Sequence, residues 1–432
     1  MNRLRNPACL LFLSLVCSVR MAAQTENFRF EQLPEETGLG SGSINDILQD
    51  HKGFLWFATW TGLVRYDGYA ARIYKQDPGN NFALKSNKVT AIYEDRHDRL
   101  WIGTNYSGFY LYDREKEGFI RFSHDPKNRN SLSSDNVWSI LEDSEGILWI
   151  GTEEGLNRFD PVRKTFICYE NDPKDNRSLS HNFVYSLMEM PDHAVWVGTE
   201  TGLNRLIKGK NGGDDFFIRY SLSPYGLSQE DYYSHNFIKS LKPAIHRPNA
   251  FWVGTSLGLK LVEYDNEDLN NLEVKTWYHN AADPTSLSNG FVNAVQPKSK
   301  DSLWVATING LNLLDIPSGK FKHFTSESRI PFSLNNNGIR SLYQDRSGIL
   351  WIGTEKGVNK LNLNAKPFQS LRLNESDKTD HVITCVINTP DKEGLWIGTR
   401  GGGLNFVPLG PEGLDRQGLR FYRLSPPRFS DQ

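Results

Sequence analysis

The side chains best suited to chemistry in this 432-residue chain are aromatic and cationic residues that could bind a sugar. Flat aromatic rings stack on the apolar faces of sugars, and cationic or polar groups hydrogen-bond hydroxyls or uronate carboxylates. Ordinary packing, or a solvated position at a loop tip, is the alternative interpretation for any single one of them. As a group, the expected ligand-binding residues are Trp60, Tyr106, Trp138, Tyr185, Lys239 and Arg340.

Carboxylates that could act as a catalytic acid and base are present at Glu153, Glu200 and Glu355. Paired carboxylates cleave glycosidic bonds when one protonates the leaving group and the other attacks the sugar or activates water. These three residues, however, recur at the same place in a repeated pattern, so a role in turn formation explains them more simply. We therefore expect no catalytic residue.

Metal ligation has weaker support than sugar binding. His181 and His235 fall at equivalent positions of two repeats, but no His or Cys cluster has the spacing of a metal site. The sequence also contains no Gly-rich phosphate loop and no nucleophile elbow. We expect no bound metal and no cofactor.

The repeats that must position these residues are marked by a recurring sequence pattern. In each copy a Trp is followed two residues later by Gly or Ala and then by Thr. A repeat of this length, with several short strands in each copy, is typical of a β-propeller, in which one sheet cannot bury its faces alone. A Trp at the same place of every apolar strand is interpreted as a packing residue between sheets, not as a platform for sugars. The eight copies are anchored by Trp56, Trp101, Trp149, Trp196, Trp252, Trp304, Trp351 and Trp396.

One copy, from Asn136 to Cys168, shows how a repeat is built. The segments VWSILED, ILWIGT, LNRFD and TFICYE read as four strands, separated by turns that contain Gly or Asp-Pro. Trp60 falls in the turn between the second and third strands of its repeat, and Tyr106 lies beside the equivalent Asn105. The other four candidates fall one residue into a first strand. Both positions are expected on one face, near the mouth of a central channel.

Counting strands predicts an all-β fold, a seven-bladed β-propeller of four-stranded antiparallel blades at residues 28–365. Seven triplets of inner strands lie between Ile44 and Leu363, and Phe28 to Leu33 can supply the seventh outer strand, which leaves no open edge. Residues 366–432 then form a partial second propeller, its first blade, preceded by a strand at Phe368 to Leu373. A ring of eight sheets is the competing count.

The first 23 residues resemble an export signal. Arg3 and Arg5 precede an apolar run from Ala8 to Val19, which is too short to span a bilayer, and Ala22-Ala23 offers small residues for cleavage. We expect a signal peptide at residues 1–23, a periplasmic location and no membrane span. Lys plus Arg number 49 and Asp plus Glu number 51, a balance that does not favour nucleic acid as a partner.

The repeats resemble the two-component regulator propeller family, the periplasmic sensor region of hybrid histidine kinases in Bacteroidetes. The resemblance is carried by SINDILQDHKGFLWFAT from Ser43, SLYQDRSGILWIGTEKGVNK from Ser341 and GLWIGTRGGGLN from Gly394. In that family two propellers precede a small β-sandwich, a membrane helix and a kinase, and the sensor responds to glycan fragments. This sequence shows no second complete ring, no membrane helix and no phospho-acceptor His segment.

The resemblance implies a sensing module without kinase activity in this chain. It also implies an oligosaccharide ligand, and a homodimer as in the resembling sensors. Two other functions stay open at this stage: a secreted propeller glycoside hydrolase or lyase, and a protein-binding scaffold.

Overall fold

The computed structural model is all-β and divides into two compact units, residues 1–364 and 365–432, which are described separately. The predicted signal peptide at residues 1–23 and the predicted strand at Phe368 to Leu373 lie outside the described residues. Described are residues 28–209, 214–224, 229–269, 271–328, 332–364, 382–391, 393–400, 403–410, 413–414 and 420–422.

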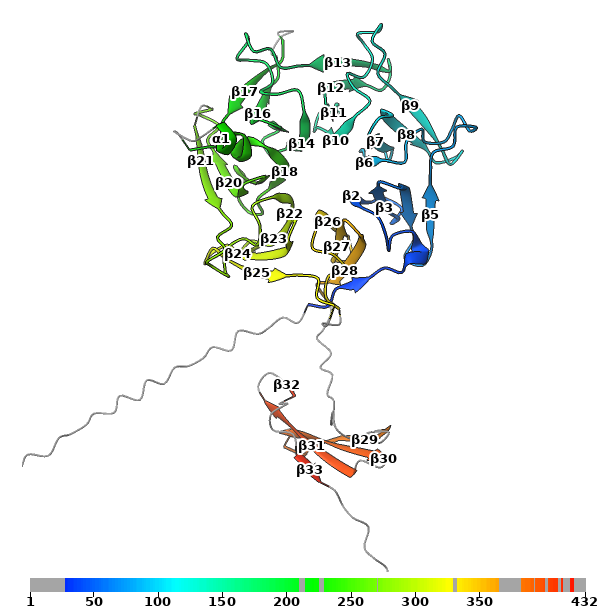
Figure 1. Ribbon diagram of the computed structural model, residues 1–432, viewed down its shortest axis with the longest axis vertical. Helices are drawn as coiled ribbons and strands as arrows, with labels where there is room; N and C mark the ends of the chain where they lie inside the picture. The colour runs from blue at the N-terminus through cyan, green and yellow to red at the C-terminus, as the bar shows by residue number, and fades with distance from the viewer. Residues whose placement is uncertain are drawn as a thin grey trace, which may run out of the picture. The chain divides into compact units, whose positions relative to one another are not determined.

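In the described part of the first unit, seven four-stranded antiparallel sheets follow one another around a ring (Figure 1). Blade 1 contains β2 (Ile44–Gln49), β3 (Leu55–Thr59), β4 (Gly62–Tyr66) and β5 (Ala71–Tyr74), after the short 3-10 helix η1 (Glu35–Thr37). Blade 2 contains β6 (Val89–Glu94), β7 (Leu100–Thr104), β8 (Phe109–Asp113) and β9 (Gly118–Phe122). Blade 3 contains β10 (Val137–Glu142), β11 (Leu148–Thr152), β12 (Gly155–Asp160) and β13 (Thr165–Tyr169).

The remaining blades of the ring have the same order. Blade 4 contains β14 (Val184–Glu189), β15 (Val195–Thr199), β16 (Gly202–Ile207) and β17 (Phe216–Tyr220). Blade 5 contains β18 (Ile238–Pro243), β19 (Ala250–Thr255), β20 (Gly258–Tyr264) and β21 (Leu272–Trp277). Blade 6 contains β22 (Val292–Ser299), β23 (Ser302–Thr307), β24 (Gly310–Asp315) and β25 (Lys320–Phe324). Blade 7 contains β26 (Ile339–Gln344), β27 (Ile349–Thr354), β28 (Gly357–Asn362) and β1 (Glu31–Gln32).

The tight turns of blade 3 show why this sequence forms short antiparallel strands. Gly146 and Gly155 have φ angles of 83° and 104°, in the left-handed region that favours glycine. Asp143 shapes the first turn, because its Oδ1 atom accepts hydrogen bonds from the backbone N–H groups of Glu145 and Ile147. The second turn carries Glu153, the position that holds Trp60 in blade 1.

Closure of the ring joins the two ends of the first unit. Glu31 pairs with Lys360 and Gln32 with Asn359, so β1 completes blade 7 beside β28. The innermost strands β2 and β26 also contact each other, and Ser341 Oγ donates to the carbonyl of Ile44 at 3.0 Å. The observed β1 is shorter than the predicted strand from Phe28 to Leu33.

The recurring Trp residues of the ring are buried between blades, as predicted. The five at positions 56, 101, 149, 196 and 304 are at most 1% exposed. Trp101, for example, stacks on Phe109 at 4.9 Å and meets Phe159 of the next blade edge-on at 5.6 Å. Because each ring fills the space between two sheets, burial of these side chains is a main source of the stability of the ring.

A helix, α1 (Gln229–Asn236), lies in the long connection between blades 4 and 5. The segment is polar and lacks an apolar stripe, so its sequence does not indicate a helix. Among the described residues, no helix has the length and apolar character needed to span a bilayer.

The second unit contains one sheet in the order β29–β30–β31, with β33 paired to β31. Its innermost strand resembles those of the ring, but Ile383 and Val386 are more than half exposed, whereas the matching Ile44 and Ile47 are buried. In the ring a neighbouring blade covers these positions. The strands are β29 (Val382–Asn388), β30 (Gly394–Arg400), β31 (Gly403–Gly410), β32 (Gly413–Leu414) and β33 (Arg420–Tyr422).

Candidate functional site

The second residue of each innermost strand occupies a special position. The register of the inner pair shifts at this residue in all seven blades, as between Ile44 and Asp46 in blade 1, so it stands outside the regular ladder. The preceding aliphatic residue is fully buried each time. Since the innermost strands surround the axis (Figure 1), these seven residues form a circle near it, which we name the axial positions: Asn45, Thr90, Trp138, Tyr185, Lys239, Asn293 and Arg340.

Three axial positions are used to build the ring. Asn45 Nδ2 donates to the carbonyl of Val89 at 2.7 Å, and Thr90 Oγ1 donates to the carbonyl of Val137 at 2.5 Å. Asn293 Nδ2 makes the same bond to Ile339 at 2.8 Å. Each bond joins a blade to the next one. The other four axial side chains make no such bond among the described residues, and these four are the ones that sequence reasoning selected.

Aromatic rings gather around two of these four residues. The ring of Trp138 lies 5.7 Å from that of Tyr185 and 5.5 Å from that of Phe183, and Phe183 stacks on Tyr185 at 4.2 Å. Phe237 meets Tyr185 edge-on at 4.9 Å and also contacts Phe291 at 6.1 Å. Sequence reasoning missed Phe183, Phe237 and Phe291, although a Phe immediately before the buried aliphatic residue in three successive blades was a usable signal.

Lys239 lies against this aromatic group. Its Nζ atom is 4.0 Å from the ring centre of Tyr185 and 5.3 Å from that of Phe237. Burial, and to a smaller extent the nearby positive charge of Arg340, lower the pKa of Lys239 to about 8, whereas Glu200 acts in the opposite direction. Burial also raises the pKa of the Tyr185 phenol above its ordinary value.

The remaining predicted residues form a second group around Trp60. This ring is fixed by a hydrogen bond from its Nε1 atom to Asn45 Oδ1 at 2.8 Å. The Arg340 guanidinium lies 5.6 Å from the centre of the Trp60 ring, and Lys88 lies 5.4 Å from it and 5.0 Å from the Tyr106 ring. Burial lowers the pKa of Arg340. Sequence reasoning missed Lys88, which bridges Trp60 and Tyr106.

The structure therefore places the six predicted residues in two groups, and the positive charge of Arg340 in one group lowers the pKa of Lys239 in the other. We name the whole arrangement the axial cluster, comprising the six residues with Lys88, Phe183, Phe237 and Phe291. Among the described residues, two buried polar atoms have no hydrogen-bond partner: Trp138 Nε1 within the cluster, and Asn105 Oδ1 in the residue before Tyr106. Aromatic faces, cations and unpaired polar atoms at one place are suited to a polar ligand with a flat ring.

The three turn carboxylates are engaged by protein groups. Glu153 accepts from Asn136 Nδ2, and Glu200 accepts from the hydroxyl of Tyr233 and lies 3.5 Å from His181. Glu355 lies near Arg340 and contributes a favourable electrostatic interaction. The three belong to three different blades, which gives no support to a paired acid and base.

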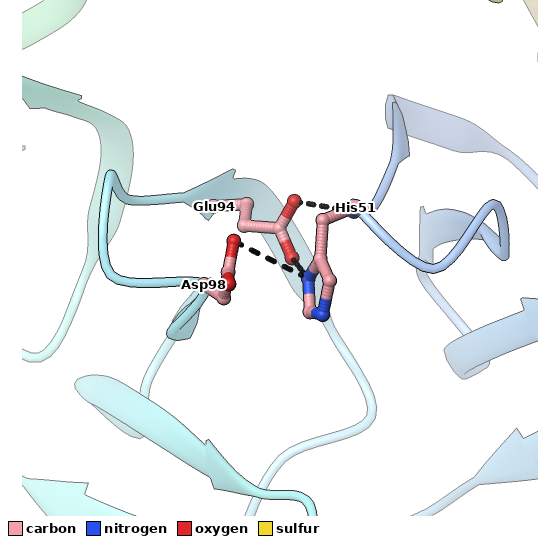
Figure 2. Close-up of side chains that lie close together, drawn as sticks. All are labelled: His51, Glu94 and Asp98. Carbon is pink, nitrogen blue, oxygen red and sulfur yellow. Dashed lines mark hydrogen bonds and ion pairs between the residues drawn. The ribbon is translucent and has the colours of Figure 1, made fainter.

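A separate cluster lies at the β2–β3 turn (Figure 2), and sequence reasoning did not select it. His51 Nδ1 is 2.7 Å from Glu94 Oε1 and 3.6 Å from Asp98 Oδ1. Among the described residues it is the one group with the geometry of a metal site. Arg114 already lies 2.8 Å from Glu94, and the His51 backbone N–H also donates to this carboxylate. The arrangement therefore serves to join blades 1 and 2.

A family model, described as two component regulator propeller, matches residues 38–61, 83–106, 131–154 and 333–356. The chain carries two component regulator propeller repeats. The matched segments cover the inner strands of blades 1, 2, 3 and 7. Blades 4, 5 and 6, which contribute Tyr185, Lys239 and α1, lie outside them.

Solved structures with the same fold include extracellular domains of signalling proteins. The extracellular domain of a hybrid two component system from B. thetaiotaomicron is 25% identical with a TM-score of 0.65, over 91% of this chain and 49% of that one. The extracellular domain of a one component system from the same organism is 21% identical, with a TM-score of 0.61, over 93% and 48%. PorZ from Porphyromonas gingivalis is 18% identical, with a TM-score of 0.56, over 84% and 52%.

A stretch of 67 residues is also 34% identical to histidine kinase P4 of Formosa agariphila, which covers 16% of this chain and 5% of that protein. The chain spans about half the length of the solved chains that it matches. The repeats and the likeness to the extracellular domain of a hybrid two component system support the role of a sensor module.

Proposed function

We propose that this chain is the ligand-sensing propeller module of a two-component signalling system, located in the periplasm, and that it recognises glycan fragments without transforming them. In this proposal the chain supplies recognition, and phosphoryl transfer belongs to other parts of the system. The homodimer implied by the family resemblance remains a prediction, which light scattering of the purified chain would test.

The axial cluster is the observation that carries the proposal. Its aromatic rings come from blades 1 to 6 and its cations from blades 2, 5 and 7, so one ligand near the axis would contact several blades at once. Among the described residues, Trp138, Tyr185, Lys239 and Arg340 contact neighbouring blades through rings and make no hydrogen bond to them. Their polar groups are therefore available to a ligand.

A sugar would bind by stacking on the exposed part of these rings while its hydroxyls pair with the polar atoms beside them. Trp60 is 43% exposed and Tyr106 is 67% exposed, which leaves ring surface available at the outer edge of the cluster.

Titration with plant and host oligosaccharides tests the proposal. Binding is followed by calorimetry and by Trp fluorescence, and the same mixtures are analysed by chromatography for products. We expect binding without turnover, and a loss of binding in Tyr185→Ala. Tyr69→Ala is the matched control, because Tyr69 is 95% exposed in the β4–β5 turn at the opposite end of blade 1. Product formation would identify an enzyme, and failure of every saccharide to bind would favour a protein-binding scaffold.

A further inference from the structure

We infer that the glycan recognised at the axial cluster is acidic, and that its carboxylate or sulfate group lies between Lys239 and Arg340. The inference rests on the proposed function and deepens it, because it names the chemical class of the ligand. It is carried by the ring contacts of two cations at axial positions, neither of which forms a hydrogen bond or ion pair with a described residue.

Neither Lys239 nor Arg340 forms an ion pair with a described residue. Among the described residues, the side chains of Lys239 and Arg340 contact rings, at 4.0 Å from Tyr185 and 5.6 Å from Trp60, and make no hydrogen bond or ion pair to a protein group. The positive charge of Arg340 is among the causes that make the Lys239 ammonium less favourable. Two like charges in a partly buried place therefore repel each other in the free protein.

Other cations of the ring have carboxylates near them. Lys242, three residues further along β18, is exposed and interacts favourably with the carboxylate of Asp46. Arg96 lies 3.0 Å from Glu142, and Arg114 lies 2.8 Å from Asp50. These two arginines form ion pairs, whereas Lys239 and Arg340 form none with the described residues.

The nearby carboxylates of Glu200 and Glu355 interact favourably with Lys239 and Arg340, respectively, but form no ion pair with them. Glu200 is bound to the Tyr233 hydroxyl and lies beside His181, and Glu355 is on the turn between β27 and β28. Aromatic rings stabilise a cation by about 0.5 to 2 kcal/mol, which compensates only part of its desolvation. A neutral sugar would bury both charges further without an acceptor, whereas one anion would pair with both.

The neighbouring rings agree with a saccharide as the carrier of this anion. Trp138, Phe183 and Tyr185 lie on one side of Lys239, and Trp60 lies beside Arg340. A uronic acid or a sulfated sugar presents an anion and a ring that can stack in one rigid unit, and the cluster offers partners for both parts.

Matched pairs of saccharides test the inference. Oligogalacturonides are compared with their carboxyl-reduced forms of the same length and linkage, and sulfated host-type disaccharides with their desulfated forms. Calorimetry is performed on the full chain and on Lys239→Gln and Arg340→Gln. Lys242→Gln is the control, since it removes another lysine of the same strand, one that interacts with Asp46 and lies outside the axial cluster. Thermal melts confirm that each variant is folded.

We expect an acidic saccharide to bind and its neutral counterpart to bind at least about tenfold more weakly. Lys239→Gln and Arg340→Gln each lower the affinity for the acidic form by about tenfold or more, and Lys242→Gln changes it by less than about twofold. If only uronates bind, the anion is a carboxylate, and if only sulfated sugars bind, it is a sulfate.

The pH dependence of saccharide affinity gives a further test, because it would not depend on Lys239 if that residue had only a structural role. The groups that face Lys239 are Arg340 from β26, Glu200 from the β15–β16 turn and the Tyr185 phenol from β14. The free ammonium has a pKa of about 8, and a bound anion stabilises its charged form. The affinity should fall as the pH rises above about 8 in the parent protein, and this fall should disappear in Lys239→Gln.

The outcomes separate the two proposals. If neutral saccharides bind as tightly as acidic ones, with no effect of Lys239→Gln, the acidic class is wrong and the glycan-sensing role stands. If no saccharide of either kind binds, the proposed function fails and the inference fails with it.

Discussion

The seven blades fall into two groups that treat the same buried Trp differently. In blades 1, 2, 3 and 7 an Asp six residues before the Trp accepts the indole N–H, at 2.9, 2.7, 2.8 and 2.8 Å. In blades 4, 5 and 6 that position holds Met190, His246 and Lys298. Trp196 Nε1 and Trp304 Nε1 are then buried without a hydrogen-bond partner among the described residues.

This difference shows that packing between sheets is sufficient to form a blade. The Asp–Trp hydrogen bond adds to the stability of the blades that have it. Blades without the bond keep the same four strands and the same buried Trp. They also supply Tyr185, Lys239 and the long connection with α1. Of the six candidate ligand-binding residues, Tyr185 and Lys239 therefore come from blades without the bond, and the other four come from blades that have it.

Blades of the first group are also linked to their neighbours by a repeated backbone bond. The residue after the Asp donates its backbone N–H to a carboxylate or amide at the end of the next innermost strand: His51 to Glu94, Arg96 to Glu142 and Ser144 to Glu189. At the closure, Arg346 makes the same bond to Gln49 at 3.0 Å. The ring is therefore sealed by the same interaction that joins its continuous blades.

The largest expected effect comes from removing the reinforcing Asp. In blade 2, Asp95 accepts from Trp101 Nε1 at 2.7 Å, from Arg99 Nε at 2.6 Å and from two backbone N–H groups. Asp95→Ala should lower the free energy of unfolding by about 3–5 kcal/mol, because it leaves buried donors and a charge unpaired.

Urea denaturation, followed by Trp fluorescence, measures this change. Glu115→Ala, at an exposed turn of the same blade, should alter stability by less than about 0.5 kcal/mol. Equal losses in both variants would show that the Asp–Trp bond does not reinforce the blade.

The second prediction is a gain in stability, and it concerns a buried lysine of blade 5. Lys260 is fully buried where other blades have Asn157, Asn204, Asn312 or Asn359, and its Nζ atom lies 3.0 Å from His235 Nδ1. Burial lowers its pKa to about 8 from the 10.5 of a free lysine. Lys260→Met removes this buried charge, so the variant should be more stable by about 1–3 kcal/mol at pH 7.

The pH dependence of this gain follows from proton binding. Between pH 8 and pH 10.5 the unfolded chain binds more protons at Lys260 than the folded chain, so the stability of the parent protein rises through this window. The gain of the variant should therefore shrink toward zero near pH 10. A difference that is constant from pH 7 to pH 10 would contradict the burial of an uncompensated charge.

The sequence was sufficient for features that repeat. The strands, the turn glycines and the burial of the Trp residues recur in every blade, so one copy explains another. The Asp–Trp bond was also predictable, since the six-residue spacing from Asp95 to Trp101 appears four times. Lys88, Phe183 and Phe237 were missed because their contacts cross from one blade to the next, and such contacts depend on the closed ring.

The helix α1 and the role of Asn45 could not be predicted from the sequence, because neither follows a pattern that the repeats share. The helix forms in an insertion without an amphipathic pattern. Asn45 looked like one more variable residue, yet it bonds to Val89 of the next blade and holds the Trp60 ring. A single side chain with both roles has no counterpart in the other repeats.

A smaller difference in stability is expected when the Trp itself is replaced in a blade with the Asp–Trp bond and in a blade without it. Trp149 and Trp196 are both fully buried in adjacent blades, but only Trp149 donates to an Asp. Substitution by Phe costs packing at both sites, and at Trp149 it also removes a hydrogen bond to a carboxylate. Trp149→Phe should therefore be about 1–2 kcal/mol more destabilising than Trp196→Phe in urea denaturation. If Trp196→Phe is the more harmful of the two, the indole N–H of blade 4 has a role that the fold does not show.

The smallest expected effect distinguishes the two kinds of axial position. Thr90 Oγ1 donates to the carbonyl of Val137, so the isosteric change Thr90→Val should cost about 1 kcal/mol of stability and leave ligand binding intact. Tyr185 makes no bond to a neighbouring blade, so Tyr185→Phe should change stability by less than about 0.5 kcal/mol. Its effect is expected in saccharide affinity, measured by the same calorimetry. Because the two residues occupy equivalent positions of the ring, the opposite pattern would mean that the circle of axial positions is not divided between building the ring and binding a ligand.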